Sequence, residues 1–392
     1  MYLAVCDGSY DRENTSRNDH ASEMSFSMRH LLGSRNTLIV KGPATIQLLA
    51  GHASALGAPL DSGSKLIVRE EKQLPIETSS EADLDIVSGK SSSIFEVEGS
   101  TIPSSWHSAL DAINEMNQGK VMVVGAGDVG KSTLTSFLAN GLLKKGIRPR
   151  IIDADIGQAD IGPPTTIASA LPTSYVYSLV GLAPSTMLFI GHTSPSHVQR
   201  KLLSGIGRLC DQEQRTLTLI NTDGWALDPE AILYKIELIE TIHPDLVLGI
   251  ATGNELDPVL SRTGASMMIE APQLVLARSQ SDRRQIRTLS YRRYLDGAST
   301  STLSKRNVQV KLPDALARSG STRTSDLRNL IVGLLDNEGY LLQIGVLLDL
   351  EEETLRVYSR SVDGLSELEL GYVKLSLEGV EMGYLDLRCP TG

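Results

Sequence analysis

The stretch GAGDVGKST at residues 125–133 constrains the fold more than any other part of the chain. Gly125, Gly130, Lys131 and Ser132 satisfy the pattern G-x-x-x-x-G-K-[S/T], with an apolar strand candidate before it and an amphipathic segment after it. In that setting the glycines let backbone amides face phosphate oxygens, and the following helix presents its positive end to them. The stretch therefore predicts a phosphate-binding loop between a strand and a helix.

This loop predicts a bound nucleoside triphosphate, with ATP as the expected nucleotide and other NTPs left open. Lys131 would reach the β and γ phosphates, and the Ser132 hydroxyl would face Mg²⁺. The residues expected to contact the nucleotide are Gly125, Gly127, Asp128, Val129, Gly130, Lys131, Ser132 and Thr133. ATP and Mg²⁺ are thus the predicted cofactors.

The sequence around the loop alternates between apolar strand candidates and helical stretches. The strand candidates are 121–124, 151–152, 217–220, 246–250 and 274–277, and the helix candidates are 132–145 and 229–242. Such alternation is typical of a parallel sheet covered by helices. Before and after this region the chain shows short apolar runs separated by turn residues, which favours small β-rich units. The predicted fold class is α/β, a P-loop NTPase-type parallel sheet core flanked by small N-terminal and C-terminal β-rich domains.

At 392 residues the chain is too long for one compact core, so several domains are expected. We predict an uncertain tail at 1–30, to which no function is assigned, and an N-terminal β-rich domain at 31–103. A P-loop kinase domain with an arginine lid follows at 104–300, and a C-terminal β-rich domain at 301–392. The third segment should open with a helix whose N-cap is Ser104 or Ser105.

Composition and charge narrow the classes of function. Cys6, Cys210 and Cys389 show neither disulfide nor metal-ligand spacing, and no apolar run is long enough to span a bilayer, which favours a cytoplasmic protein without a membrane partner. The net charge of −10 argues against a protein coated with nucleic acid. Residues 278–293 are the exception, because six arginines and one acid, Asp282, give them a local charge of +5.

The segment DADIGQ follows the second strand candidate and offers acidic groups near the loop. Asp153 and Asp155 occupy alternate positions, so both can point to the same side of the strand end. Either carboxylate could hold the Mg²⁺ shell or accept a proton, which makes Ser132, Asp153 and Asp155 the candidate metal residues. Gln158 could position a nucleophile by hydrogen bonding.

Four separate pieces of the chain resemble one known family. They are GAGDVGKST, DADIGQ, INTDGW and RSQSDRRQIR, to which FIGHTSP and STIPSSW can be added. Together they resemble the polynucleotide 5′-hydroxyl kinases, which include the kinase subunit of the pre-mRNA 3′-end cleavage factor, the nucleolar pre-rRNA-processing kinase and archaeal relatives. The resemblance covers most of the chain, which looks like an archaeal-type member.

The resemblance implies ATP-dependent phosphorylation of the 5′-hydroxyl end of RNA and/or DNA. Single-stranded 5′-hydroxyl ends would be the partners, and no protein partner is indicated. Asp155 would orient or deprotonate the hydroxyl with Gln158 beside it, and Trp225 and Thr193 would clasp the terminal base. A stacking ring suits such a kinase, because every base offers a π-face.

The resemblance also explains the arginine-rich segment as a lid that closes over the phosphates. Arg278, Arg283 and Arg287 match the arginine positions of that lid, and the last two, four residues apart, would share one helix face. Arg292 and Arg293 are left outside the predicted site as surface residues.

Two other functions remain open from the sequence. A P-loop ATPase would use water as the acceptor, whereas a GTPase is disfavoured because ATGNELD does not supply the N-K-x-D guanine motif. An ATP-binding scaffold subunit of an RNA-processing complex would bind the nucleotide without turnover. The sequence does not choose between RNA and DNA.

Overall fold

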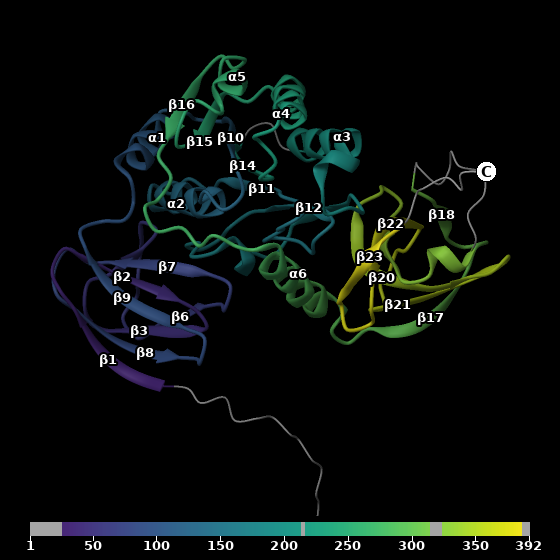
Figure 1. The fold of residues 1–392 in the computed structure, drawn as a ribbon, viewed down its shortest axis with the longest axis horizontal. Coiled ribbons are helices and arrows are strands. Elements are labelled where there is room, and N and C mark those ends of the chain that lie inside the picture. Colours follow the sequence, from purple (N-terminus) through teal and green to yellow (C-terminus); the bar gives the residue numbers. More distant parts are fainter. Residues whose placement is uncertain (1–25, 213–215, 314–323, 386–392) are drawn as a thin grey trace, which may run out of the picture.

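The computed structural model describes residues 26–212, 216–313 and 324–385, whose strands form four sheets (Figure 1). Two sheets come from the N-terminal part, one from the middle and one from the C-terminal part of the chain. No helix among these residues is long and apolar enough to cross a membrane.

The two N-terminal sheets are antiparallel and pack face to face. The first has the order β1 (Phe26–Leu32), β8 (Ala82–Ser88), β3 (Ala44–Gly51), β6 (Lys65–Val68). The second has the order β5 (Ala58–Pro59), β4 (Ser54–Ala55), β7 (Gln73–Glu77), β2 (Asn36–Lys41), β9 (Ser93–Glu98). Alternate side chains along β3 and β8 are buried, because one face of the sheet meets the core. Residues 26–30, which the sequence assigns to the tail, belong to strand β1, and residues 1–25 lie outside the described part.

The central sheet is mixed rather than wholly parallel. Its order is β13 (Thr186–Phe189), β12 (Thr166–Ala170), β11 (Arg150–Ala154), β14 (Leu217–Thr222), β10 (Gly119–Gly125), β15 (Leu246–Ile250), β16 (Ser266–Ile269). The five strands from β11 to β16 are parallel, and β12 and β13 add an antiparallel edge that the sequence did not predict. The predicted α/β core is confirmed.

Helices cover both faces of this sheet. Alternate residues of β10 point to opposite cores, Val121 to the side of α1 (Ser104–Asn114) and α2 (Lys131–Lys144), and Met122 to the opposite side. That opposite side carries α3 (Gln199–Asp211) and α4 (Pro229–Ile242), and the short α5 (Asp257–Leu260) follows β15. The first core continues into the N-terminal sheets.

Two local predictions are wrong. Residues 274–277 are not a strand, and β16 at Ser266–Ile269 takes the fifth parallel position. Leu274 and Val275 stay exposed, because this apolar run connects the sheet to α6 (Gln280–Leu295) instead of pairing with β15. The N-cap of α1 is Pro103 rather than Ser104 or Ser105. The Ser105 hydroxyl instead accepts from the Glu270 amide at 3.1 Å.

The C-terminal sheet packs against the central one with α6 beside it (Figure 1). Its order is β17 (Ser299–Ser304), β21 (Thr354–Ser359), β20 (Leu341–Leu350), β19 (Leu330–Leu335), β22 (Glu367–Leu375), β18 (Gln309–Lys311), and β23 (Glu381–Tyr384) pairs with β22. Phe189 of β13, Tyr291 of α6 and Ile331 of β19 share one core. The flanking β-rich parts are confirmed, while the domain boundaries stay a prediction.

The two sheets meet backbone to backbone at a pair of glycines. The Tyr372 amide donates to the Gly191 carbonyl at 2.8 Å, and a Cβ on Gly371 would lie 2.7 Å from that carbonyl oxygen. Backbone atoms cannot rotate away as the end of a side chain can. Gly371 therefore allows the C-terminal sheet to reach the loop that carries residues 191–195.

We expect Gly371→Ala to destabilise the protein by about 1–3 kcal/mol, because the added methyl group must push the two backbones apart. Urea denaturation of the purified variant measures the change. Gly264→Ala is the matched control, because a Cβ there has no neighbour within 4 Å. Equal stability of the two variants would contradict the close approach.

Candidate active site

A cavity of about 660 Å³ lies at the carboxyl end of the parallel strands. Ligands of open α/β sheets bind at this edge, because the loops after the strands converge there. The loops after β10, β11 and β14, the segment of α6 and the β6–β7 turn of the N-terminal sheets all reach it. Its lining includes Glu71, Lys72, Gln73, Gly127, Asp128, Gly130, Lys131, Ser132, Thr133, Asp155, Gln158, Thr193, Asp223, Trp225, Arg278, Arg283 and Arg287.

The phosphate loop has the predicted backbone form. Gly130 is the N-cap of α2 with φ +97°, a conformation that glycine adopts without strain. Of the eight residues predicted to contact a nucleotide, six line the cavity. Gly125 and Val129 do not, and the Val129 side chain instead packs against the place where a Gly125 Cβ would stand.

Lys131 is buried beneath this loop. Its ammonium donates to the carbonyls of Gly125 at 3.1 Å and Ala126 at 2.6 Å. Burial lowers the pKa of Lys131 to about 8, although the negative charge of Asp155 acts in the opposite direction. A buried cation whose hydrogen bonds within the described part of the chain go to carbonyls is suited to receive an anionic ligand.

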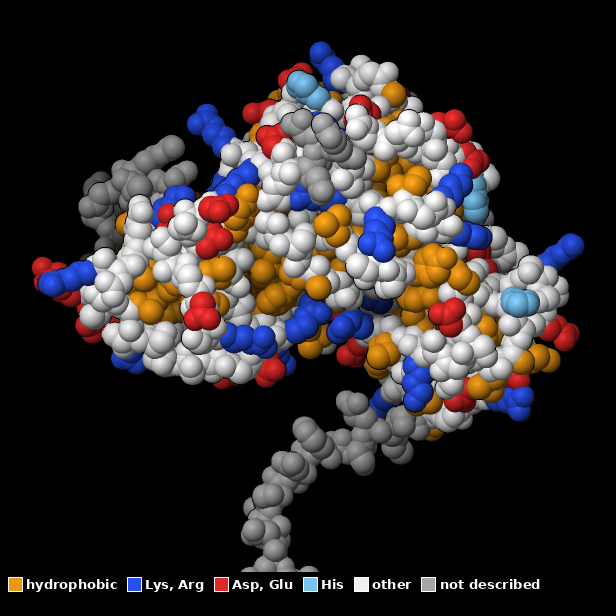
Figure 2. All heavy atoms as spheres, turned by 180° about the vertical axis from the view of Figure 1, so that it is seen from behind, with side chains coloured by type: hydrophobic (Ala, Val, Ile, Leu, Met, Phe, Trp, Pro, Cys, Tyr) orange, Lys and Arg blue, Asp and Glu red, His pale blue; other side chains and the backbone are white. Residues whose placement is uncertain are grey.

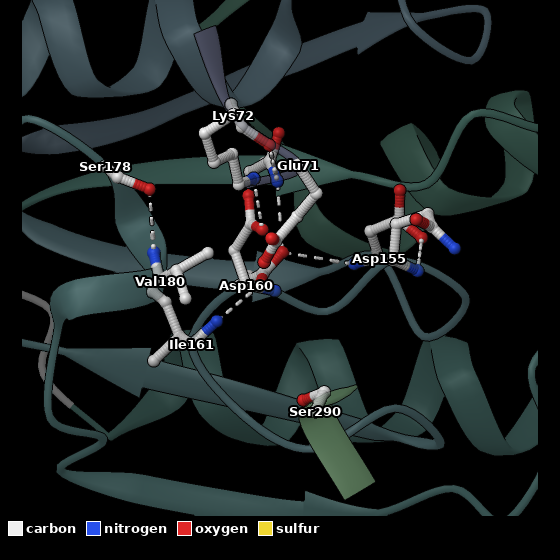
Figure 3. Close-up of polar contacts among 12 residues, drawn as sticks. Glu71, Lys72, Asp155, Asp160, Ile161, Ser178, Val180 and Ser290 are labelled. Atoms are coloured by element: carbon white, nitrogen blue, oxygen red, sulfur yellow. Dashed lines mark hydrogen bonds and ion pairs between the residues drawn. The ribbon is translucent and has the colours of Figure 1, made fainter. Parts of the chain in front are cut away.

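Asp155 faces the cavity and is fixed by its own loop (Figure 3). Its Oδ1 accepts from the amides of Gly157 at 3.1 Å and Gln158 at 2.9 Å, which leaves Oδ2 for other partners. Burial raises the pKa of Asp155 above its ordinary value, while Lys131 and the two amides oppose the rise. A carboxylate with a raised pKa is a better proton acceptor.

Asp153, the other predicted carboxylate, does not line the cavity. Its Oδ2 accepts from the amides of Asp160 at 2.6 Å and Ile161 at 3.0 Å, and its Oδ1 from Asn221 at 3.0 Å. Burial, together with the charges of Asp160 and Asp155, raises the pKa of Asp153 to about 7. Asp153 therefore stabilises the loop after β11. The two predicted carboxylates are not brought together at the cavity, because only Asp155 of the two lines it.

An ion pair that was not predicted from the sequence joins the N-terminal sheets to the loop after β11. The Lys72 ammonium lies 2.7 Å from Asp160 Oδ1, as Figure 3 shows. Lys72 follows β6, 88 positions before its partner, so neither motif nor spacing reveals the contact. The N-terminal part thus forms one wall of the cavity and fixes the loop after β11.

Gln158 lies on the cavity wall beside the lid. Its Nε2 donates to the Gly157 carbonyl at 2.8 Å and to the Arg283 carbonyl at 3.5 Å. Its Oε1 is buried without a protein partner among the described residues. A buried unpaired acceptor at the edge of a cavity is a place where a ligand donor can bind.

Trp225 lines the cavity and is held in place by neighbouring side chains. Its ring stacks on Tyr234 with centroids 5.5 Å apart, and its Nε1 donates to Asp228 at 2.6 Å. Its amide donates to Asp223 Oδ1 at 3.0 Å, and Asp223 Oδ2 accepts from Lys235 at 2.9 Å and from the Tyr234 hydroxyl at 3.0 Å. The fragment NTDGW pointed to Trp225, but Asp223, which supports it, was missed.

Thr193, the second predicted clasp residue, also lines the cavity. Its hydroxyl is hydrogen-bonded to the Tyr384 hydroxyl of β23 at 2.7 Å. The C-terminal sheet thereby reaches the same wall, which no sequence signal indicated.

The three predicted lid arginines line the cavity but have carboxylate partners. Arg278 and Arg283 lie 3.2 and 2.7 Å from the Asp128 carboxylate, and Arg278 also donates to the Glu71 carbonyl at 3.0 Å. Arg287 donates to the Glu381 carboxylate of β23 through Nε at 2.5 Å and Nη2 at 2.8 Å. The lid thus spans from the phosphate loop to the C-terminal sheet.

Arg292 and Arg293 do not line the cavity, and Arg292 donates to the Glu378 carbonyl at 2.9 Å. Figure 2 shows Lys and Arg side chains gathered at the lower centre of the molecule, where Figure 1 places α6. The sequence itself concentrates positive charge in the lid of an acidic chain, because residues 278–293 contain six arginines and one acid.

The described residues contain no group of three or more His, Cys, Asp or Glu side chains that could hold a metal ion. Ser132 and Asp155 line the cavity, whereas Asp153 does not. Any cation there would need phosphate oxygens and water as further ligands, which is the usual binding mode of Mg²⁺ beside a nucleotide.

We expect Asp223→Ala to lower stability by about 3–5 kcal/mol, because it leaves the fully buried Lys235 ammonium without its carboxylate. Denaturant unfolding measures the loss. Glu353→Gln removes the exposed Arg306–Glu353 pair and should change stability little. A loss for Asp223→Ala no greater than that of this control would contradict the supporting role.

Residues 125–297 match a family model described as the mRNA cleavage and polyadenylation factor CLP1 P-loop. A polyribonucleotide 5′-hydroxyl-kinase of Pyrococcus horikoshii is 27% identical over 340 residues, covering 73% of this chain and 94% of that protein. A protein of the same name from Methanocaldococcus jannaschii is 25% identical over 345 residues, covering 73% of this chain and 95% of that protein. A CLP1 homologue of Arabidopsis thaliana is 28% identical over 285 residues, covering 64% and 63%.

Among solved structures, Clp1p in its complex with Pcf11p superposes with a TM-score of 0.68 at 14% identity, covering 90% of this chain and 99% of that chain. At this identity the match shows the fold alone, and it supports the three-part architecture. The resemblance that the four sequence motifs predict is confirmed by these matches.

Proposed function

We propose that this chain, a relative of the polyribonucleotide 5′-hydroxyl-kinases, transfers the γ-phosphoryl group of ATP to the 5′-hydroxyl end of a polynucleotide. One observation carries the proposal. The phosphate loop, Asp155 and the lid arginines converge on one cavity whose wall also carries Trp225 and Thr193. The nucleotide, the acceptor hydroxyl and the terminal base would thus all be bound by residues that line the same cavity.

The chemistry needs a nucleophile, a proton acceptor and a leaving group. The 5′-hydroxyl oxygen forms a bond to the γ-phosphorus, and the bond from that phosphorus to the bridging oxygen breaks. The leaving nucleoside diphosphate keeps the electron pair, and the hydroxyl proton passes to the Asp155 carboxylate. Asp155 suits this role because one of its oxygens is held by amides and its pKa is raised. Gln158 would orient the hydroxyl through its unpaired Oε1.

Cations around the cavity would stabilise the charge that moves during transfer. Lys131 would bind the β and γ phosphates from below, and Arg278, Arg283 and Arg287 would bind the transferring oxygens from the lid. Because Asp128 already binds Arg278 and Arg283, the triphosphate would compete with that carboxylate for them. Arginine suits this exchange, since its planar group can bind carboxylate or phosphate through two donors.

Ser132 would hold Mg²⁺ directly, and Asp155 would hold it through a coordinated water, which keeps Oδ2 of Asp155 available to the hydroxyl proton. The Ser132 hydroxyl lies at the cavity, and among the described residues its hydrogen-bond contact is a long one, 3.3 Å, from Asn221. When bound, Mg²⁺ would neutralise part of the charge on the β and γ phosphates. Asp153 is left out of this set, because its oxygens already accept from Asn221 and two amides.

RNA is the first substrate class to test, because relatives that are covered over more than nine-tenths of their length carry the name polyribonucleotide 5′-hydroxyl-kinase. Stacking by Trp225 requires no particular base, so many sequences would be accepted. We further propose single-stranded ends as the substrate and a cytoplasmic location.

The deciding experiment supplies γ-labelled ATP and Mg²⁺ with a 5′-hydroxyl RNA oligonucleotide, the matching DNA, and the same RNA carrying a 5′-phosphate. We expect label on the 5′-hydroxyl oligonucleotides and none on the 5′-phosphorylated control. Lys131→Ala should abolish the transfer, because the buried cation that receives the phosphates is lost. Release of labelled phosphate without labelled oligonucleotide would identify an ATPase, and nucleotide binding without either product would identify a scaffold.

Asp155→Asn separates proton transfer from nucleotide binding. The amide keeps the shape of the side chain but removes the acceptor charge, so kcat should fall by about 10² or more while ATP still binds. Steady-state kinetics and nucleotide titration measure the two effects.

Asp153→Asn is the matched control, because it alters a carboxylate that lies off the cavity. We expect a milder loss of kcat, accompanied by lower stability as the loop after β11 loosens. Equal losses of kcat in the two variants would show that Asp155 is not the distinct proton acceptor.

A further inference from the structure

Tyr384 of β23 stands just outside the cavity and has no role in the proposed transfer. Its hydroxyl is hydrogen-bonded to Thr193 at 2.7 Å, and Thr193 lines the cavity whereas Tyr384 does not. With 45% of its surface exposed, Tyr384 is open to solvent although it is held by a cavity residue. An aromatic ring is thus presented immediately beyond the wall that carries Thr193.

A second ring supports Tyr384 from behind. The His192 ring is stacked on it with centroids 5.0 Å apart and planes inclined by 24°. His192 is buried, packs edge-on against His197 at 4.6 Å, and accepts from the Ser194 amide through Nδ1 at 2.8 Å. Burial and the neighbouring His197 lower the pKa of His192 to about 4, so the supporting ring is neutral near pH 7.

The strand that carries Tyr384 is fastened to the lid. Glu381, three residues earlier, is buried and accepts two hydrogen bonds from Arg287, and its carbonyl accepts from Arg284. After Tyr384, the Leu385 amide donates to the Tyr372 carbonyl at 2.7 Å. Tyr384 is therefore held between the Arg287 side of the cavity and Thr193.

If the terminal base of a polynucleotide binds at Trp225 and Thr193, the chain has to pass out of the cavity from there. Its second nucleotide then lies just outside the cavity wall. Resting on the proposed function, we propose that the Tyr384 ring, supported by His192, stacks on the base of the second nucleotide from the 5′ end. The site would form a second base subsite that does not discriminate between bases, because stacking requires only a π-face. The C-terminal sheet would thereby take part in binding the substrate.

The test removes the ring and the base separately. Wild type, Tyr384→Ala and Tyr384→Phe are assayed with a 5′-hydroxyl RNA 10-mer and with the same 10-mer lacking only its second base. For wild type, the missing base should raise the oligonucleotide KM roughly tenfold, the usual size of one stacking contact, with kcat nearly unchanged. Tyr384→Ala should raise KM for the intact 10-mer by the same factor and should show no further effect of the missing base. Tyr384→Phe keeps the π-face but loses the hydrogen bond to Thr193, so whatever its KM for the intact 10-mer, it should still respond to the missing base as wild type does.

Trp225→Ala is the matched comparison, because it acts on the terminal base and should still respond to loss of the second base. A Tyr384→Ala protein that responds to the missing base as wild type does would overturn the subsite. If Tyr384→Ala unfolds, Tyr384→Leu keeps apolar bulk without a π-face, and the same comparison of the two oligonucleotides decides. A wild type that labels no oligonucleotide would contradict the proposed function, whereas an active wild type indifferent to the second base would contradict the subsite alone.

Discussion

The parallel pairing of β10, β14 and β11 sets the place of the phosphate loop, Asp155 and Trp225 in the cavity. Asn221 of β14 is in register with Val123 of β10 on one side and Asp153 of β11 on the other. Its amide donates to Asp153 at 3.0 Å and to Ser132 at 3.3 Å, so the two flanking loops are fixed to the strand between them. Because parallel strands end at one edge, the phosphate loop, Asp155 and Trp225 meet there although they are far apart in the sequence.

Charge balance is the second constraint on the site. Nearly every cation near the cavity has a protein partner: Lys72 pairs with Asp160, Arg283 with Asp128 and Arg287 with Glu381. Lys131 donates to loop carbonyls, and burial lowers its pKa to about 8 although the charge of Asp155 opposes this. A triphosphate bound there would bring the missing negative charge to Lys131 and would compete for the lid arginines. The proposed function thus requires positive charge only at this point, which is compatible with the net charge of −10 of the chain.

The sequence predicts best what depends on short segments. The phosphate loop, its strand and its helix were recognised because glycine spacing and apolar runs determine them locally. Strand 274–277 was wrong because an apolar run of four cannot show whether a neighbouring strand is free to pair, and β16 already fills the position beside β15. Asp153 and Asp155 looked equivalent by alternation, but the turn after β11 directs one carboxylate to its amides and the other to the cavity.

Contacts between parts of the chain that are far apart could not be predicted from one sequence. Glu381 and Tyr384 belong to a strand of ordinary composition, and only the docking of the C-terminal sheet brings them to Arg287 and Thr193. That docking is possible because Gly371 has no Cβ and its backbone can therefore lie against the backbone of Gly191.

Because of this docking, the arginine lid is attached to the C-terminal sheet. A helix that moved alone over the phosphates would need an exposed, unattached surface. Instead Arg284, Arg287 and Arg292 of α6 all donate to the segment 378–381, and Tyr291 is buried in the core shared with the C-terminal sheet. At its other end α6 is preceded by Arg278, which binds Asp128 of the phosphate loop. Any displacement of α6 must therefore break these contacts or carry the C-terminal sheet with it, and the second course must also break the contacts of that sheet with Phe189, Gly191 and Thr193. The lid and the C-terminal sheet are thus packed as one unit, and this packing would connect the proposed base subsite on β23 to the arginines of the lid.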